Sequence, residues 1–216
     1  MNKEVDLSVS CYGKVKDRKY DIVILPWGAT EPHNLHLPYM TDCILSHDVA
    51  VDAALMAIQK YGVNCMVMPP IGMGSQNPGQ RELPFCIHTR YETQKAILTD
   101  IVSSLYVQGI RKLIIIKDHF ENPGDHADEV ETSVMMHYHP ELVNLEEAGN
   151  GEYKTFAVQS LNEKVAWIPR NWGKVSKDTG VGDPRGASVE KGKKFAEAVA
   201  EKYAKLFDEL VNQELY

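Results

Sequence analysis

The first half of the chain contains short runs of consecutive apolar residues. In the segments between these runs, apolar residues recur at a longer spacing. Each run is four residues long, at 22–25, 65–68 and 113–116. Continuous apolar runs of this length are typical of strands in a parallel sheet with both faces covered. We therefore predict three buried strands, and we expect the run at 113–116 to be the fully buried central one.

Longer segments carry apolar residues at the three- and four-residue spacing of one helix face. The helix at 89–108 begins with Thr89 and Glu92, which have the spacing of a capping box, in which two side chains satisfy free backbone N–H groups. The segments predicted as helices are 43–60, 89–108, 127–139 and 187–210.

The alternation of strands and helices predicts an α/β fold, with three α-β-α layers and a mostly parallel sheet. The segment 145–183 is richer in Gly, Asn and Lys, and we expect loops and short strands that wrap around the sheet. Neither an internal repeat nor a low-complexity tract interrupts the sequence. Residues 1–216 are therefore expected to form a single domain.

The charge and the apolar content of the chain limit the classes of partner it can bind and the compartment in which we expect it. Lys and Arg number 23 against 30 Asp and Glu, a formal net charge of −7, which offers no counter-charge to nucleic acid or an anionic membrane. The apolar runs fall short of the ~20 residues of a membrane span, and the N-terminus has no apolar signal core. Four cysteines without a CxxC pair are typical of reduced, buried thiols. These features predict a cytoplasmic protein.

Residue types that bind metal ions gather in two loops that follow predicted strands, where sites form in open α/β sheets. The first loop contains Glu31, His33 and Asp42, and the second contains His119 and Glu121. In extended backbone, residues two apart point the same way, so each Glu–His pair could reach one site. A mixed oxygen and imidazole set suits Zn²⁺, Mn²⁺ or Fe²⁺. From spacing alone, ordinary hydrogen-bonded or surface side chains are an equal alternative.

Three blocks, in order along the chain, resemble the signatures of the creatininase (creatinine amidohydrolase) family. Residues 31–42 resemble its E-x-H-G-x-H-L-P…T-D signature, and residues 119–122 resemble its H-x-E-N signature. Residues 126–133 are similar to the third block, a His-Ala followed by Glu-Thr-Ser. The stretches 75–79 and 182–192 also fit. The resemblance covers nearly the whole chain and implies the creatininase-like α/β fold.

The resemblance implies two divalent metal ions, which could be zinc, manganese or iron. Glu31, Asp42 and His119 would hold one ion. His33, Asp42 and Glu121 would hold the other, so that Asp42 bridges the pair. Two such ions would activate a water molecule and polarise a carbonyl group.

The resemblance also implies roles for His126 and Glu131. His126 would act as the general acid or base that hands a proton to the leaving nitrogen. Glu131 would orient His126 or a ligand, although a capping or surface carboxylate is an equal alternative for it. The family hydrolyses small, often cyclic amides, so we expect a metal-dependent amidohydrolase acting on a small-molecule amide. Family members are often hexamers, which leads us to expect a homo-oligomer.

The chain departs from the family pattern at several points near these blocks. Only residues 123–125 separate the second block from the third, where the family has a few tens of residues, and they read as a tight turn. Met40, Lys117 and Asp118 replace the glycine or small residues usual in the family. These changes leave an alternative open: an engineered or remodelled creatininase scaffold that has lost catalysis, with or without bound metal. A nucleotide-binding protein ranks low, because no GxGxxG or GxxxxGK[ST] motif is present.

Several further residues have structural explanations. Trp27 is expected in the core, whereas Trp167 and Trp172 are either packing residues or aromatic lids over a ligand. His36 is expected to support the site or the fold rather than to bind metal.

Overall fold

The computed structural model describes residues 4–117 and 124–214 of the chain. Its sheet has three parallel strands in the order β2-β1-β3. The strands are β1 (Ile22–Pro26), β2 (Cys65–Val67) and β3 (Leu113–Ile116), so the three apolar runs do form strands.

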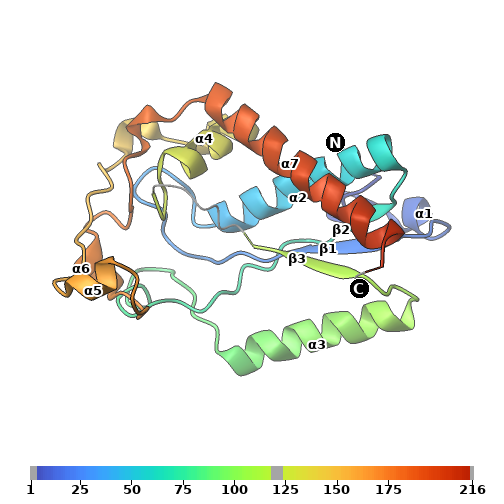
Figure 1. The fold of residues 1–216 in the computed structure, drawn as a ribbon, viewed down its shortest axis with the longest axis horizontal. Helices are drawn as coiled ribbons and strands as arrows, with labels where there is room; N and C mark the ends of the chain where they lie inside the picture. Colours follow the sequence, from blue (N-terminus) through green and yellow to red (C-terminus); the bar gives the residue numbers. More distant parts are fainter. Residues whose placement is uncertain (1–3, 118–123, 215–216) are drawn as a thin grey trace.

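Helices lie on both sides of this sheet and give the three predicted layers (Figure 1). On one side, α2 (Thr41–Tyr61) and α4 (Glu129–Tyr138) pack against α7 (Val189–Asn212), and α2 also packs against β1 and β2. On the other side lies α3 (Tyr91–Val107). The α/β prediction is confirmed, and each predicted helix agrees with the structure to within two residues at either end.

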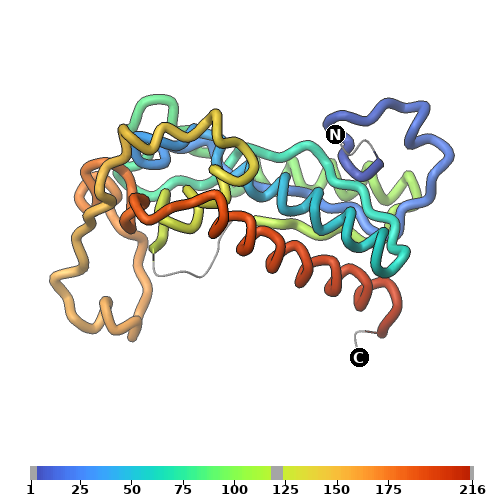
Figure 2. Tube along the Cα trace, turned by 90° about the horizontal axis from the view of Figure 1, so that it is seen from above, coloured from blue at the N-terminus to red at the C-terminus, as the bar shows by residue number. Residues whose placement is uncertain are grey.

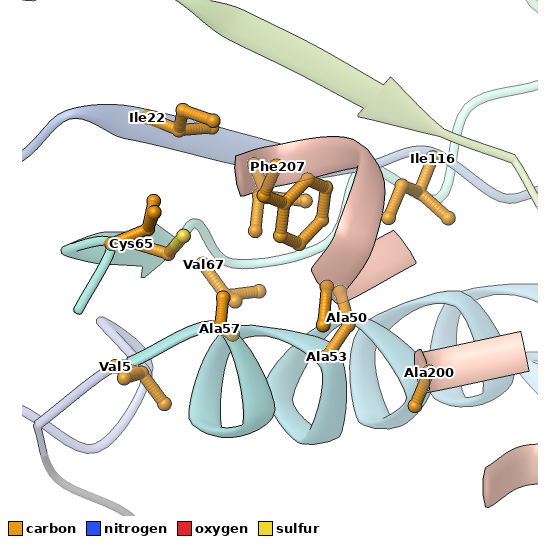
Figure 3. Close-up of a cluster of buried hydrophobic side chains, with 14 residues drawn as sticks. Val5, Ile22, Ala50, Ala53, Ala57, Cys65, Val67, Ile116, Ala200 and Phe207 are labelled. Carbon is orange, nitrogen blue, oxygen red and sulfur yellow. The ribbon is translucent and has the colours of Figure 1, made fainter. Parts of the chain in front are cut away.

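The main core lies between the sheet and the pair α2 and α7 (Figure 3). Phe207 of α7 is fully buried there, near the strand residues Ile22 and Val67. Burying a side chain of this size stabilises the fold by roughly 1.5–3 kcal/mol. Alanines occupy the facing sides of both helices, and small side chains let the two backbones approach closely. The fully buried alanines are Ala50, Ala53, Ala54 and Ala57 of α2 and Ala196, Ala200 and Ala204 of α7.

The predicted position of β3 in the sheet is wrong. Among the residues that the structure describes, the strand pairs with β1 alone and so lies at an edge, and Ile115 is 45% exposed. The central strand is β1, all five residues of which are buried. The physical reason is that an apolar run reports burial in general, whereas strand order depends on how the crossover helices lead the chain across the sheet.

Two other local predictions are also wrong. Thr89 does not cap α3: the N-cap residue is Arg90, which makes no side-chain capping bond, and the Thr89 carbonyl accepts from Gln94 instead. The segment 145–183 forms loops with short helices and isolated bridges rather than short strands. The short elements inside this segment are η2 (Leu145–Glu147), α5 (Gln159–Asn162) and α6 (Trp172–Val175). The short elements outside it are α1 (Tyr12–Val15), η1 (Pro140–Leu142) and η3 (Pro184–Gly186).

The burial of the cysteines and the apolar content of the helices can be compared with what the sequence predicts. The four cysteines are thiols; three are buried and Cys11 is exposed, against the expectation that all are buried. Within the described residues, none of the helices combines the length and the apolar content of a membrane span.

The crossing of α4 and α7 depends on a glycine. A Cβ atom at Gly192 would overlap the carbonyl oxygen of Ser133, a backbone atom that cannot rotate away. We expect Gly192→Ala to lower the free energy of unfolding by about 1–3 kcal/mol, the usual cost of overpacking. Urea unfolding measures the change. Gly13→Ala is the matched control, since a Cβ atom there would have nothing within 4 Å. An equal, small effect of both substitutions would contradict the close crossing.

A cluster of histidines and aspartates joins α2 to its neighbours and makes stability depend on pH. His47 lies 3.1 Å from a carboxylate oxygen of both Asp6 and Asp48. Burial opposes a charge on His47, but the hydrogen bond that His47 donates to Asp48 and the attraction of both carboxylates outweigh it and raise the pKa of His47.

This raised pKa sets the sign of the pH effect. The stabilisation is fully present below the unfolded pKa of about 6.5 and is lost as the pH rises through the folded pKa. We therefore expect His47→Asn to lower the free energy of unfolding more at about pH 6 than at about pH 9. Urea unfolding of both proteins at the two pH values tests this, and an equal loss at both would contradict it.

Candidate metal centre

The site begins where the end of β1 meets the start of α2, at the carboxyl end of the strands. A Cβ atom at Gly28 would lie 2.6 Å from the backbone nitrogen of Cys43 and 2.7 Å from Cβ of Asp42. Only glycine allows this approach. The loop 29–40 therefore leaves the end of β1 and returns to it at the start of α2 (Figure 1). Glu31 belongs to this loop, and Asp42 lies in the first turn of α2.

His33 forms the buried centre of this loop. Its ring is fully buried, with Nε2 2.8 Å from Oδ1 of Asp42 and Nδ1 3.0 Å from the carbonyl oxygen of Glu31. Both ring nitrogens thus donate to oxygen acceptors. Burial opposes the charge on His33, but Asp42 outweighs it and raises the pKa of His33 to about 10. The pKa of Asp42 is correspondingly lowered by His33, against the effect of its own burial.

Glu31 lies beside this pair with both carboxylate oxygens directed at polar groups. Oε1 lies 3.8 Å from Nδ1 of His126, and Oε2 accepts a hydrogen bond of 3.2 Å from Gln80. Burial and then repulsion from Asp42 raise the pKa of Glu31 to about 7. Gln80 had no role in the sequence analysis, although it directly follows the 75–79 stretch that fits the family.

His126 reaches the same place in spite of the short connection before it. Its backbone pairs with Val181, accepting a hydrogen bond of 2.8 Å from the Val181 N–H. The ring lies 4.2 Å from that of His33, centroid to centroid, and Nε2 donates to the carbonyl of Pro32 at 2.9 Å. Trp172 meets the ring edge-on at 5.4 Å.

Glu31, His33 and His126 therefore form a candidate metal site. One potential ligand atom from each lies within 4.8 Å of the others. The donor set of one carboxylate and two imidazoles, with the Asp42 carboxylate bonded to His33, suits a divalent ion such as zinc or manganese. His126, expected as a proton carrier, thus also stands among the possible ligands. The predicted ligands His119 and Glu121 lie outside the described residues.

Glu131 is buried near these groups, but its carboxylate faces the backbone. Oε2 accepts a 2.5 Å hydrogen bond from the N–H of Ala127, just before α4, while Asp128 caps the helix by accepting from two backbone N–H groups. Burial raises the pKa of Glu131 to about 7. His36 lies further from the centre, with Nε2 2.8 Å from the hydroxyl oxygen of Thr132.

A cavity of about 940 Å³ opens over the candidate ligands. Trp27, expected in the core, is instead half-buried in its wall, with its indole N–H donating to the Met73 carbonyl. Trp172 is buried and packs, whereas Trp167 is 82% exposed at the rim, on a segment that projects from the body (Figure 2). Amide side chains from Gln76, Asn77, Gln80 and Gln94 complete one side of the cavity.

Comparison with known proteins identifies related sequences. The family model described as "Creatininase: Creatinine amidohydrolase" matches residues 10–124 and 121–207. The two matched stretches meet at the short connection between the second and third sequence blocks.

Three relatives illustrate the range of similarity. A Bacteroides fragilis protein provisionally assigned as a creatinine amidohydrolase is 58% identical, with a TM-score of 0.96 and 100% of both chains covered. The 3-dehydro-scyllo-inosose hydrolase of Thermotoga maritima is 24% identical over 91% of this chain and 79% of its own. A creatininase in a manganese form, and a variant in a zinc–zinc form, are 19% identical; their TM-scores are 0.79 and 0.78, and 97% of this chain is aligned with 100% and 99% of theirs. At that identity, the creatininases show the shared fold alone.

The Bacteroides relative argues against an engineered origin for this chain. It aligns over its full length with the full length of this protein. The match with a natural protein therefore runs across the short connection after the second block. Its effect on catalysis is a separate question.

We expect Asp42 to be essential for metal binding, because the predicted arrangement has it shared by two ions. Elemental analysis of protein purified without chelator should find about two divalent ions per chain, as in two-metal hydrolase sites. Asp42→Asn should reduce that content by at least about half, since an amide is a poorer ligand than a carboxylate. Asp48→Asn, on the same helix but paired with His47 and His139, is the control and should retain the metal. Full metal content in folded Asp42→Asn protein would refute the role.

Proposed function

Because the chain belongs to the creatininase family, we propose that it is a metal-dependent hydrolase of a small, often cyclic amide, using water activated by two divalent ions. The observation that carries this proposal is the convergence of Glu31, His33 and His126, with Asp42 beside them, under the cavity. The relatives named for the hydrolysis of creatinine and of 3-dehydro-scyllo-inosose support a small-molecule substrate.

The geometry of His33 fits a metal ligand. Its Nδ1 donates to the Glu31 carbonyl, the kind of hydrogen bond that fixes the tautomer of a ligating imidazole. Its Nε2 then faces Asp42 and would be the ligating atom once its proton is lost. Zinc, manganese or iron bound here would supply a nucleophilic hydroxide at neutral pH and polarise the scissile carbonyl.

The geometry of His126 selects one nitrogen for chemistry. Because Nε2 donates to the Pro32 carbonyl, Nδ1 is left to face Glu31 and the cavity. We assign to Nδ1 the transfer of a proton to the leaving nitrogen, with metal binding by the same atom as the alternative. Glu131 would act at one remove, because its contact with the Ala127 N–H holds the start of α4 just after His126.

We further propose that the protein is cytoplasmic and forms a homo-oligomer, a hexamer being the expected form. Exposed apolar side chains on α3 and β3 support the assembly, since a lone chain leaves them in water. Tyr106 is 63% exposed, Val107 86% and Ile115 45%.

A creatininase-fold scaffold without catalysis is the second candidate function. The short connection after the second block motivates it, because the family has further structure there. It predicts bound metal without turnover, so an activity measurement separates the two.

Hydrolysis by the metal-loaded protein is the direct test. We expect turnover of at least one of the amides creatinine and small formamides, abolished by chelator and restored by zinc or manganese. His126→Asn should lower kcat by about 10²–10⁴-fold, the usual contribution of a positioned proton carrier. His139→Asn is the control, because that histidine pairs with Asp48 outside the cavity. A folded, metal-loaded protein inactive on the whole panel would favour the scaffold.

A further inference from the structure

The cavity wall carries cations that the proposed hydrolysis does not use. Lys117, Lys164 and Arg170 line it, although the chain as a whole has a net charge of −7. Four acidic side chains line the same cavity, those of Glu31, Asp42, Asp125 and Glu131. Among all these groups, the cations without an acidic partner are the ones that favour a ligand of opposite charge.

The acidic groups and Arg170 in this cavity already have partners. Arg170 forms an ion pair with Asp125, and its guanidinium group lies 4.9 Å from the Trp172 ring centroid. Asp42 contacts His33, and Glu31 contacts Gln80. Glu131 accepts from the Ala127 N–H, so each of the four carboxylates already has a partner in the protein.

Lys117, like Lys164, differs from these groups. Among residues 4–117 and 124–214, its ammonium group has neither an ion-pair nor a hydrogen-bond partner. It directly follows β3, whose last carbonyl, at Ile116, accepts a 2.8 Å hydrogen bond from the Trp27 N–H. That bond holds the backbone where Ile116 meets Lys117 at the carboxyl end of the sheet. Its charge is close enough to act on both Glu31 and Asp42.

We propose that the substrate carries a carboxylate group and that Lys117 binds it, so that Lys117 determines specificity for an anionic substrate. The inference rests on the proposed function and adds the chemical class of its substrate. A single ammonium group suits a singly charged carboxylate, whereas phosphate is usually held by several cations or backbone N–H groups. The side chains of Gln76 and Gln94 on the cavity wall would orient the rest of the molecule by hydrogen bonds.

Matched inhibitors test this without knowledge of the substrate. Acetohydroxamate and malonomonohydroxamate both chelate metal ions, but only the second carries a carboxylate. Isothermal titration of each into the zinc-loaded full chain should give a Kd roughly tenfold lower for the carboxylate-bearing probe, about the value of one charge-assisted contact. Lys117→Met should bring the ratio of the two Kd values close to one, and Lys117→Arg should restore most of it.

The control is Lys174→Met, which removes an exposed positive charge in α6 that does not line the cavity, and it should keep the wild-type ratio. Equal binding of both probes by the wild-type protein would overturn the inference while leaving the hydrolase proposal intact. An unchanged ratio in Lys117→Met would do the same. Failure of zinc-loaded protein to bind either probe would instead contradict the proposed function and, with it, the inference.

Discussion

The structure depends on the contact between the end of β1 and the start of α2. Gly28 allows the two backbones to meet, so the loop between them begins and ends at the same place. His33 is thereby buried against Asp42, with Nε2 of His33 2.8 Å from Oδ1 of Asp42. The packing of α2 on the sheet through its alanines holds this contact in place. Fold and site therefore share one constraint, because the helix that forms the core also carries a candidate ligand.

The electrostatics of this contact explain why a metal ion would bind there. Burial opposes a charge on His33, but Asp42 above all, with Glu131 and Glu31, raises the pKa of His33 to about 10. A site that stabilises one buried positive charge in this way would also stabilise a divalent cation in its place. Burial and then the negative charge of Asp42 raise the pKa of Glu31 to about 7, so a cation bound beside the two carboxylates would favour the ionised form of both.

Local patterns predicted most of the fold, and non-local pairing accounts for what they missed. The strands and helices follow from apolar period, which each segment carries by itself. The edge position of β3 depends on pairing with β1, about which its own residues say nothing. His126 reaches the site through backbone pairing with Val181, which lies far along the chain. No sequence pattern predicted the hydrogen bond from Gln80 to Glu31, since Gln80 merely follows the stretch 75–79 that fits the family.

The central claim is that two metal ions lie at Asp42, under the cavity. An anomalous-diffraction map of zinc-loaded crystals tests it most directly, because it locates each ion without assumptions about ligands. We predict two peaks about 3.5–4 Å apart, as in known two-metal sites, both in contact with the Asp42 carboxylate. A single peak held by Glu31, His33 and His126, with Asp42 still bonded to His33, would contradict the dinuclear account.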